Sequence, residues 1–202
     1  GIINTFLSYE PSSLGEQILR QSKREKKSLV IRFFDEDFLR ISDHLYTKFF
    51  FDEILQGIEI VSKAMDANEV VFVIDKNFDK SKVEYFSRIP NGHILEMNTK
   101  KYPAGFKREI TFAFNKTFKK ANNISISEDD LFVDSGTMYE VFKAIVNGIP
   151  SISKLIHFSG NCLKASCFMD VKIGFRIRDI VDQLGGFKEQ PSLVVINGLV
   201  CG

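Results

Sequence analysis

Two short, uninterrupted apolar runs constrain the fold of this chain more than any other feature. The segments SLVIRFF (28–34) and EVVFVIDK (69–76) are almost continuously apolar, which is typical of parallel strands that are covered on both faces. Between them, residues 49–67 place apolar side chains at helical spacing on one face. A strand, a helix and a second strand in this order predict a right-handed βαβ crossover.

The same rhythm continues to about residue 150. A helix over KVEYFSRI (82–89), a strand over HILEMN (93–98), a helix after Gly105 and a strand-to-helix segment DDLFVDSGTMYEVFKAIVNGIP (129–150) follow in turn. We expect Ser135 to cap the last helix, and Gly148 with Pro150 to end it. Residues 1–150 therefore predict a Rossmann-like, doubly wound α/β domain.

The pattern changes at Ser151. Two strands, a helix over IRDIVDQLGG (177–186) and a strand over PSLVVING (191–198) follow within about 50 residues. We interpret residues 151–202 as a small β-grasp-like domain, with Pro150 at the boundary. The connection is so short that the two units are expected to pack as one body.

Composition excludes several classes of protein. The 27 basic residues balance the 26 acidic ones, so no basic field predicts binding to nucleic acid. No apolar run reaches the roughly 18 residues that span a bilayer, and no basic segment precedes the short apolar start. We expect a cytoplasmic chain. Cys162, Cys167 and Cys201 fit no disulfide, zinc or iron-sulfur motif and are expected to be reduced.

Ligands of doubly wound folds bind at the carboxyl ends of the strands, so these ends hold the candidate site residues. After the first strand come Asp35, Glu36 and Asp37, with Asp43 and His44 further on. Such acids suit a magnesium site or an acid/base pair. Because consecutive residues rarely converge on one ion, a solvated loop with capping acids is the favoured interpretation. No metal site and no catalytic residue is assigned.

The turn VDSGTM offers the best phosphate cradle in the chain. Gly136 and the helix after it could present free N–H groups to a phosphate. The neighbouring Asp134 would repel an anion, so a structural turn is favoured. Neither GxGxxG nor GxxxxGK[ST] occurs, and the three histidines are too scattered to indicate a catalytic pairing.

In order, these segments resemble the RnfC family of the Rnf electron-transport complex and, more remotely, the flavoprotein subunit of respiratory complex I. The segments VDSGTMYEVFKAIVNGIPSISKLIHFSGNCLK and VKIGFRI follow the family patterns VQNVGTAxAVxxAVxxGxPLxxRxVTVxGxAV and VxIGTPI. YPAG at 102–105 matches YPxG, and the terminal NGLVCG lies where relatives have GGPMMG. The resemblance implies a Rossmann-like FMN and NADH domain followed by a soluble-ligand-binding β-grasp domain.

The departures from the family fall on positions that bind the flavin in relatives. EPSSLGEQI stands in place of GxGGAGFPT, and RFFDEDFLRISDHLY in place of NGAECEPYLTADDRL. Arg32 and Asp134 thus occupy the places of flavin-contacting asparagines, and Phe33 the place of a glycine. The cysteine-rich ferredoxin segment of relatives has no counterpart. If any cofactor-binding residues survive, they are Arg32, Asp35, Asp37, Asp134, Ser135, Gly136 and Thr137.

Three functions stay open at this point. The first is a divergent, truncated, non-catalytic component of an Rnf-like complex that has lost FMN, NADH and iron-sulfur binding and therefore needs no cofactor. Its partners would be other subunits of a membrane-associated complex, on the inner face of the membrane and without direct insertion. The second is an FMN- and NADH-binding oxidoreductase subunit. The third is a β-grasp module that binds a ligand or a protein through exposed Phe168 and Phe175.

Overall fold

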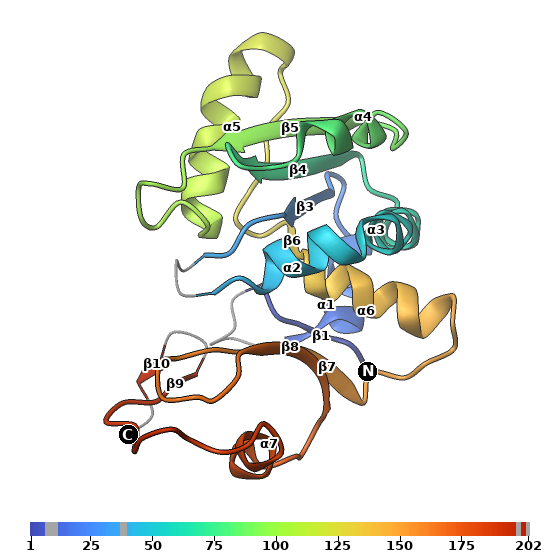
Figure 1. Ribbon diagram of the computed structural model, residues 1–202. Coiled ribbons are helices and arrows are strands. Elements are labelled where there is room, and N and C mark those ends of the chain that lie inside the picture. Colours follow the sequence, from blue (N-terminus) through green and yellow to red (C-terminus); the bar gives the residue numbers. More distant parts are fainter. Residues whose placement is uncertain (7–11, 37–39, 197–198, 201–202) are drawn as a thin grey trace.

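A four-stranded parallel sheet lies at the centre of the computed structural model, which describes residues 1–6, 12–36, 40–196 and 199–200 (Figure 1). The strand order is β5-β4-β3-β6. The chain therefore moves outward from β3 through β4 to β5 and then returns to the other side of β3. The strands are β3 (Ser28–Arg32), β4 (Glu69–Asp75), β5 (Gly92–Met97) and β6 (Leu131–Asp134). The predicted α/β class with a parallel, Rossmann-like sheet is confirmed.

Both faces of this sheet are covered, which explains why its central strands are continuously apolar. Leu29 and Ile31 point into one hydrophobic cluster, whereas Val30 between them belongs to a second cluster on the opposite face. Alternate side chains of a strand point to opposite faces, so all five residues of β3 are buried. The fit between the apolar runs and the two covers fixes the position of the sheet.

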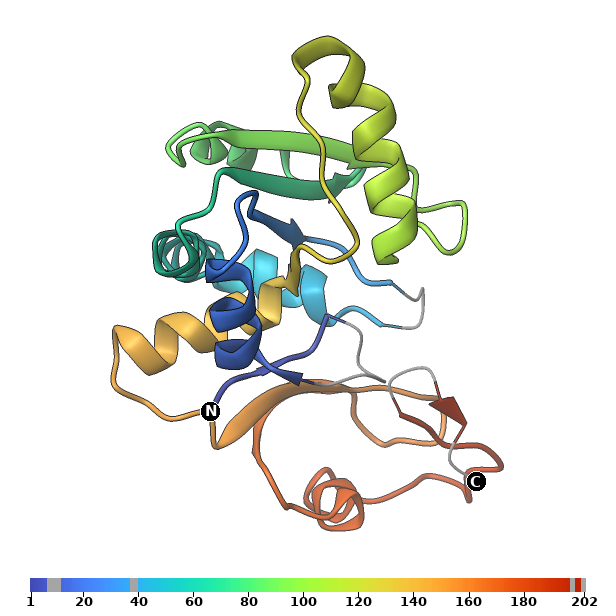
Figure 2. The ribbon, with the colours of Figure 1, turned by 180° about the vertical axis from the view of Figure 1, so that it is seen from behind.

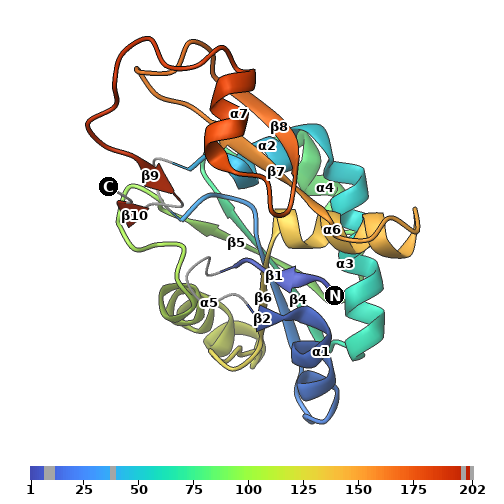
Figure 3. The ribbon, with the colours of Figure 1, turned by 90° about the horizontal axis from the view of Figure 1, so that it is seen from below.

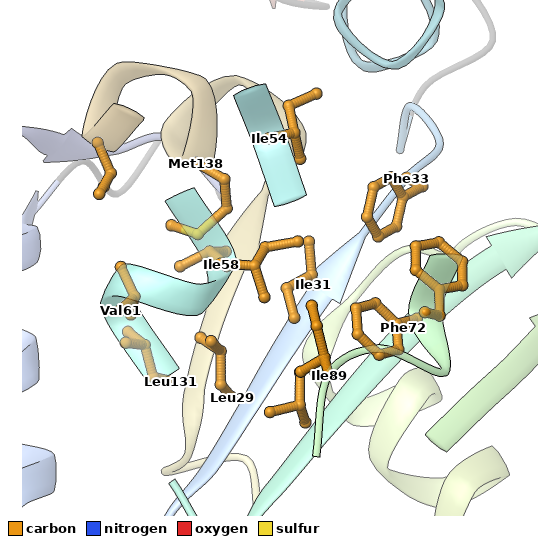
Figure 4. Packing of buried hydrophobic residues seen from close by; sticks show 14 of the residues in the cluster. Leu29, Ile31, Phe33, Ile54, Ile58, Val61, Phe72, Ile89, Leu131 and Met138 are labelled. Atoms are coloured by element: carbon orange, nitrogen blue, oxygen red, sulfur yellow. The ribbon is translucent and has the colours of Figure 1, made fainter. Parts of the chain in front are cut away.

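The helices are divided unequally between the two faces. One face carries most of them, and its packing is drawn in Figure 4. The other face is covered by α5 (Lys107–Asn122), which buries Ile110 and Phe114 against the sheet (Figure 2). The helices of the first face are α1 (Leu14–Ser22), α3 (Phe51–Met65), the short α4 (Val83–Phe86) after the turn η1 (Lys80–Lys82), and α6 (Ser135–Ile145).

Helices α3 and α6 approach each other closely at Gly57. A Cβ atom at this position would lie 2.1 Å from the backbone oxygen of Met138, far inside van der Waals contact. Ile54, Ile58 and Met138 lie beside one another at this crossing (Figure 4). Only glycine lets the two helix backbones pack at this separation.

Two local features differ from the sequence-based expectations. Helix α2 (Ser42–Phe49) precedes α3 and was not predicted, because its buried residues include polar Asp43 and Thr47 rather than an apolar stripe. The cap of α6 was also assigned wrongly. Asp134, not Ser135, is the N-cap, and its Oδ1 accepts a hydrogen bond from the Thr137 backbone N–H at 2.7 Å. A carboxylate in this position also complements the positive end of the helix dipole.

The C-terminal third forms a hairpin and a helix beside α2 and α6. The hairpin consists of β7 and β8, and β9 pairs with β10 rather than with the hairpin in the described part of the chain. The β-grasp arrangement thus stays a prediction, as does the domain boundary at Pro150. The elements are β7 (Ser153–Phe158), β8 (Cys167–Lys172), α7 (Ile177–Gln183), β9 (Val195–Ile196) and β10 (Leu199–Val200), and at the other terminus β1 (Ile3–Asn4) pairs with β2 (Ser12–Ser13).

Two further sequence-based expectations concern cysteines and membrane spans. Cys162 and Cys167 carry free thiols, and Cys201 lies outside the described residues. Among the described helices, none is both long and apolar enough to cross a bilayer.

Candidate functional site: the crevice between β3 and β6

The order of the strands reverses between β3 and β6, which run side by side with Arg32 opposite Asp134. In open α/β sheets, ligands bind outside the carboxyl ends of the strands at such a switch point. Both residues stand at the carboxyl ends of their strands and are buried. The sequence-predicted residues Arg32, Asp35, Asp134, Ser135, Gly136 and Thr137 all lie along this edge; Asp37 is outside the described residues.

The Arg32 side chain fills this crevice. It is 0% exposed, and its guanidinium lies 4.4 Å from the centroid of the Phe6 ring. Nη1 donates to Glu36 Oε2 at 2.9 Å and to the backbone oxygen of Gly105 at 3.0 Å. Nη2 donates to the backbone oxygen of Phe6 at 3.2 Å and lies 3.5 Å from Asp43 Oδ2. Groups of this chain thus take up the hydrogen-bonding capacity that a ligand would otherwise meet.

Asp43, which α2 brings into the crevice, links its two walls. This carboxyl group is 2% exposed, and its Oδ1 accepts a hydrogen bond from Ser135 Oγ at 2.6 Å. Burial, followed by the charges of Asp134 and Asp35, raises the pKa of Asp43 to about 8, although Arg32 and the Ser135 hydroxyl oppose the shift. Asp43 is therefore close to the balance between its neutral and charged forms at physiological pH.

The acids that follow β3 have structural partners. The Asp35 carboxylate accepts hydrogen bonds from the backbone N–H groups of Asp43 and His44 at the start of α2. Glu36 pairs with Arg32 and also with Arg40. Burial raises the pKa of Asp35, against the effect of these hydrogen bonds. The described residues contain no group of three or more His, Cys, Asp or Glu side chains arranged to hold a metal ion.

The N-terminus of α6 is covered by aromatic side chains. A Cβ atom on Gly136 would lie 2.9 Å from Cε2 of Tyr46, so the tyrosine ring rests directly on this glycine. Tyr46 is 5% exposed and meets the ring of Phe168, on β8, edge-on with centroids 6.0 Å apart. The Thr137 hydroxyl is engaged as well, because it lies 3.2 Å from the hydroxyl of Thr5. The turn that resembles a phosphate cradle is thus closed from within the chain.

Phe33 does not enter the crevice. It is 3% exposed and packs in the aromatic part of the core with Phe51, Phe78 and Phe86, its ring centroid 5.2 Å from that of Phe86. The side chain that fills the site is its neighbour Arg32. Since adjacent residues of a strand point to opposite faces, a large residue at position 33 adds to the core rather than to the crevice.

Sequence patterns missed the contributions of Phe6 and Tyr46. Phe6 comes from the N-terminal segment, 26 residues before Arg32, and Tyr46 comes from the unpredicted helix α2. The signal available was the aromatic character of both residues, which 20 phenylalanines in the chain obscure. Histidines do not contribute imidazole groups here; His93, for example, pairs with Glu69 at 2.6 Å at the opposite end of β4 and β5.

The raised pKa of Asp43 predicts how stability depends on pH. From an ordinary value of 3.8 to about 8 in the fold, the folded protein holds a proton that the unfolded chain has released. The contribution of this group to the free energy of unfolding is therefore complete below about pH 4 and is lost as pH rises through about 8. Urea unfolding between pH 5 and 8 measures the slope.

Matched variants separate Asp43 from other acids in this measurement. Asp43→Asn should flatten the fall in stability with pH, because asparagine cannot release a proton. Asp52→Asn changes an exposed acid at the start of α3 and should leave the slope of the parent protein. An unchanged slope in Asp43→Asn would assign the pH dependence to other groups.

Comparison with known proteins gives relatives at low sequence identity. No family model matches the chain. It is 20% identical over 83% of its length to the RnfC-type subunit of the Na(+)-translocating ferredoxin:NAD(+) oxidoreductase complex of Acetobacterium woodii, of which it covers 38%. It is 24% identical over 75% of its length to the proton-translocating counterpart of Clostridium ljungdahlii, covering 33% of that protein. The corresponding subunit of an ion-translocating oxidoreductase complex of Haemophilus influenzae is 26% identical over 66% of the chain, which spans 17% of it.

Proposed function

Because the chain is a divergent relative of the RnfC-type subunits of ion-translocating oxidoreductase complexes, we propose that it is a non-catalytic component of an electron-transport complex. The relatives are named as subunits of multi-subunit assemblies, and the chain spans less than two-fifths of the length of these three relatives. Its partners under this proposal are the other subunits of such a complex. Its place is peripheral, on the inner face of the membrane.

The observation that carries the proposal is the complete burial of Arg32 in the crevice where this fold binds its ligands. To admit a flavin phosphate, the guanidinium would have to leave Glu36, Asp43 and two backbone oxygens. That displacement would leave buried carboxylates without their cation, which is strongly unfavourable. Tyr46 would also have to leave Gly136 before α6 could present its N-terminus.

This arrangement supports the loss of the FMN and NADH sites. The surviving candidates Asp35, Asp134, Ser135 and Thr137 each hold a position in the fold: two carboxylates cap helices, and two hydroxyls bond neighbouring side chains. A residue that is engaged in this way is available to a cofactor only after local rearrangement. The structural roles explain why the acids are present without a cofactor to bind.

A ligand titration tests the proposal. We expect the purified protein to be colourless, and millimolar FMN or NADH to leave its melting temperature unchanged. A ligand that binds only the native state stabilises it by RT ln(1 + [L]/Kd), so even weak binding would raise the melting temperature. A saturable rise with either compound, absent with riboflavin or adenosine at the same concentration, would revive the oxidoreductase alternative.

A further inference from the structure

The connection between β8 and α7 is the most unusual surface of the described chain. Residues 172–178, with the sequence KIGFRIR, are all exposed. Apolar Ile173, Phe175 and Ile177 are 67%, 51% and 45% exposed, and the basic residues of the segment alternate with them. Figure 3 views the molecule from the side on which β7, β8 and α7 lie. We call residues 172–178 the apolar-basic loop.

The surrounding surface extends the apolar part of this loop. The backbone N–H of Ile173 donates to the backbone oxygen of Ile152 at 2.9 Å, which places the 149–152 connection beside the loop. Ile149 and Ile152 are 45% and 56% exposed. In contrast, Val171 and Ile180, just outside the loop on each side, are buried. The chain thus changes from core to a projecting apolar edge within two or three residues.

We propose that the apolar-basic loop docks on an anionic lipid bilayer surface. The loop contains Lys172, Arg176 and Arg178 and no acid. Arg176 pairs with Asp179 at 2.9 Å, an exposed contact that the phosphate groups of lipids can replace. Cations near an anionic surface are attracted to it, and aliphatic and aromatic side chains enter the boundary between headgroups and acyl chains.

The way the charges are distributed favours a bilayer over a protein partner. The core of a protein interface is depleted of charged residues, which gather at its rim. Here the cations alternate with the apolar side chains through the middle of the loop. At a bilayer surface this alternation is favourable, because each apolar side chain can reach hydrocarbon while each cation stays among phosphates.

A second basic surface, on α5, provides the matched comparison. Phe112 is 67% exposed there, and with Arg108 and Lys116 it lines an open groove of about 530 Å³. This surface has cations and one aromatic ring, but no neighbouring set of exposed aliphatic side chains on the helix. If charge alone directs the protein to lipid, α5 and the apolar-basic loop should contribute equally.

Co-sedimentation with vesicles tests the inference. We expect the protein to bind phosphatidylglycerol–phosphatidylcholine vesicles, to ignore pure phosphatidylcholine, and to bind more weakly as salt is raised. The double variant I173S/F175S should weaken binding at least about tenfold, because both side chains lose their transfer into the bilayer. K172E/R178E should weaken it about tenfold or more at low salt. The control F112S/K116E on α5 should bind as the parent protein does.

Four results would overturn the inference. They are no binding to anionic vesicles, equal binding to phosphatidylcholine, unchanged binding by I173S/F175S, and loss of binding in F112S/K116E. Light scattering over a concentration series completes the test: a dimer that I173S/F175S abolishes would assign the loop to a second copy of the chain instead. The inference does not depend on the closed crevice, because flavin titration and vesicle binding are separate measurements.

Discussion

Replacing Gly57 by alanine is expected to destabilise the protein severely. The new Cβ would lie 2.1 Å from the backbone oxygen of Met138 and 2.9 Å from its carbonyl carbon. Because both contacts are with the backbone, no side-chain rotation relieves them, and α3 and α6 must move apart. We expect a loss in free energy of unfolding at or above the upper end of the about 1–3 kcal/mol that overpacking usually costs. Chemical unfolding monitored by circular dichroism measures it.

Gly15→Ala is the control for this variant. Gly15 lies in α1, where a Cβ would approach nothing closer than Ser13 Oγ at 3.9 Å. Alanine should therefore leave stability unchanged or raise it by up to about 1 kcal/mol, since it favours the helix over the unfolded chain. Equal effects of the two substitutions would show that the α3–α6 crossing is looser than the structure indicates.

Replacing Arg32 by alanine is expected to have a comparable effect for an electrostatic reason. The substitution removes the cation that faces Glu36 and Asp43, whose side chains are 8% and 3% exposed. Removing one partner of a buried ion pair typically costs about 3–5 kcal/mol. Arg32→Lys, which keeps the charge but lacks the second nitrogen, should fall between alanine and the parent protein. Urea unfolding at pH 7 measures the series.

Two further variants identify the cause of that loss. R32A/D43N should recover part of the lost stability, because it also removes one of the uncompensated carboxylates. Arg176→Ala breaks the exposed pair with Asp179 and should cost no more than about 1 kcal/mol. A loss of less than about 1 kcal/mol in Arg32→Ala would mean that the buried cluster contributes little to holding the crevice closed.

The parallel sheet was predictable because burial on both faces leaves a direct mark in the sequence. The apolar runs at 28–34 and 69–76 match β3 and β4 closely, and the helix that predicts the α3 face has Ile54, Ile58, Val61 and Met65 buried. In such segments local pattern and tertiary packing agree. Helix α2 lacks this agreement, since buried Asp43 and Thr47 make its inward face polar.

The crevice was predictable in place but not in content. The carboxyl ends of β3 and β6 followed from the strand order, and the resemblance indicated the individual residues. The contacts of Arg32 could not be predicted, because Phe6, Asp43 and Gly105 come from segments far apart in the chain. Whether an arginine faces solvent or fills a cavity depends on such long-range packing. Capping by Asp134 rather than Ser135 was open for a similar reason, since either residue type suits an N-cap.

The contact between Phe168 and Tyr46 has a consequence for how the polypeptide can be divided. Phe168 belongs to the C-terminal hairpin, yet it packs on the ring that rests on Gly136 in the α/β part. Leu155, from the same hairpin, also packs against the main core. A fragment that stops at Pro150 would expose Tyr46 and these core positions to water. The boundary at Pro150 is thus one of chain rhythm, and the two parts are expected to depend on each other for folding.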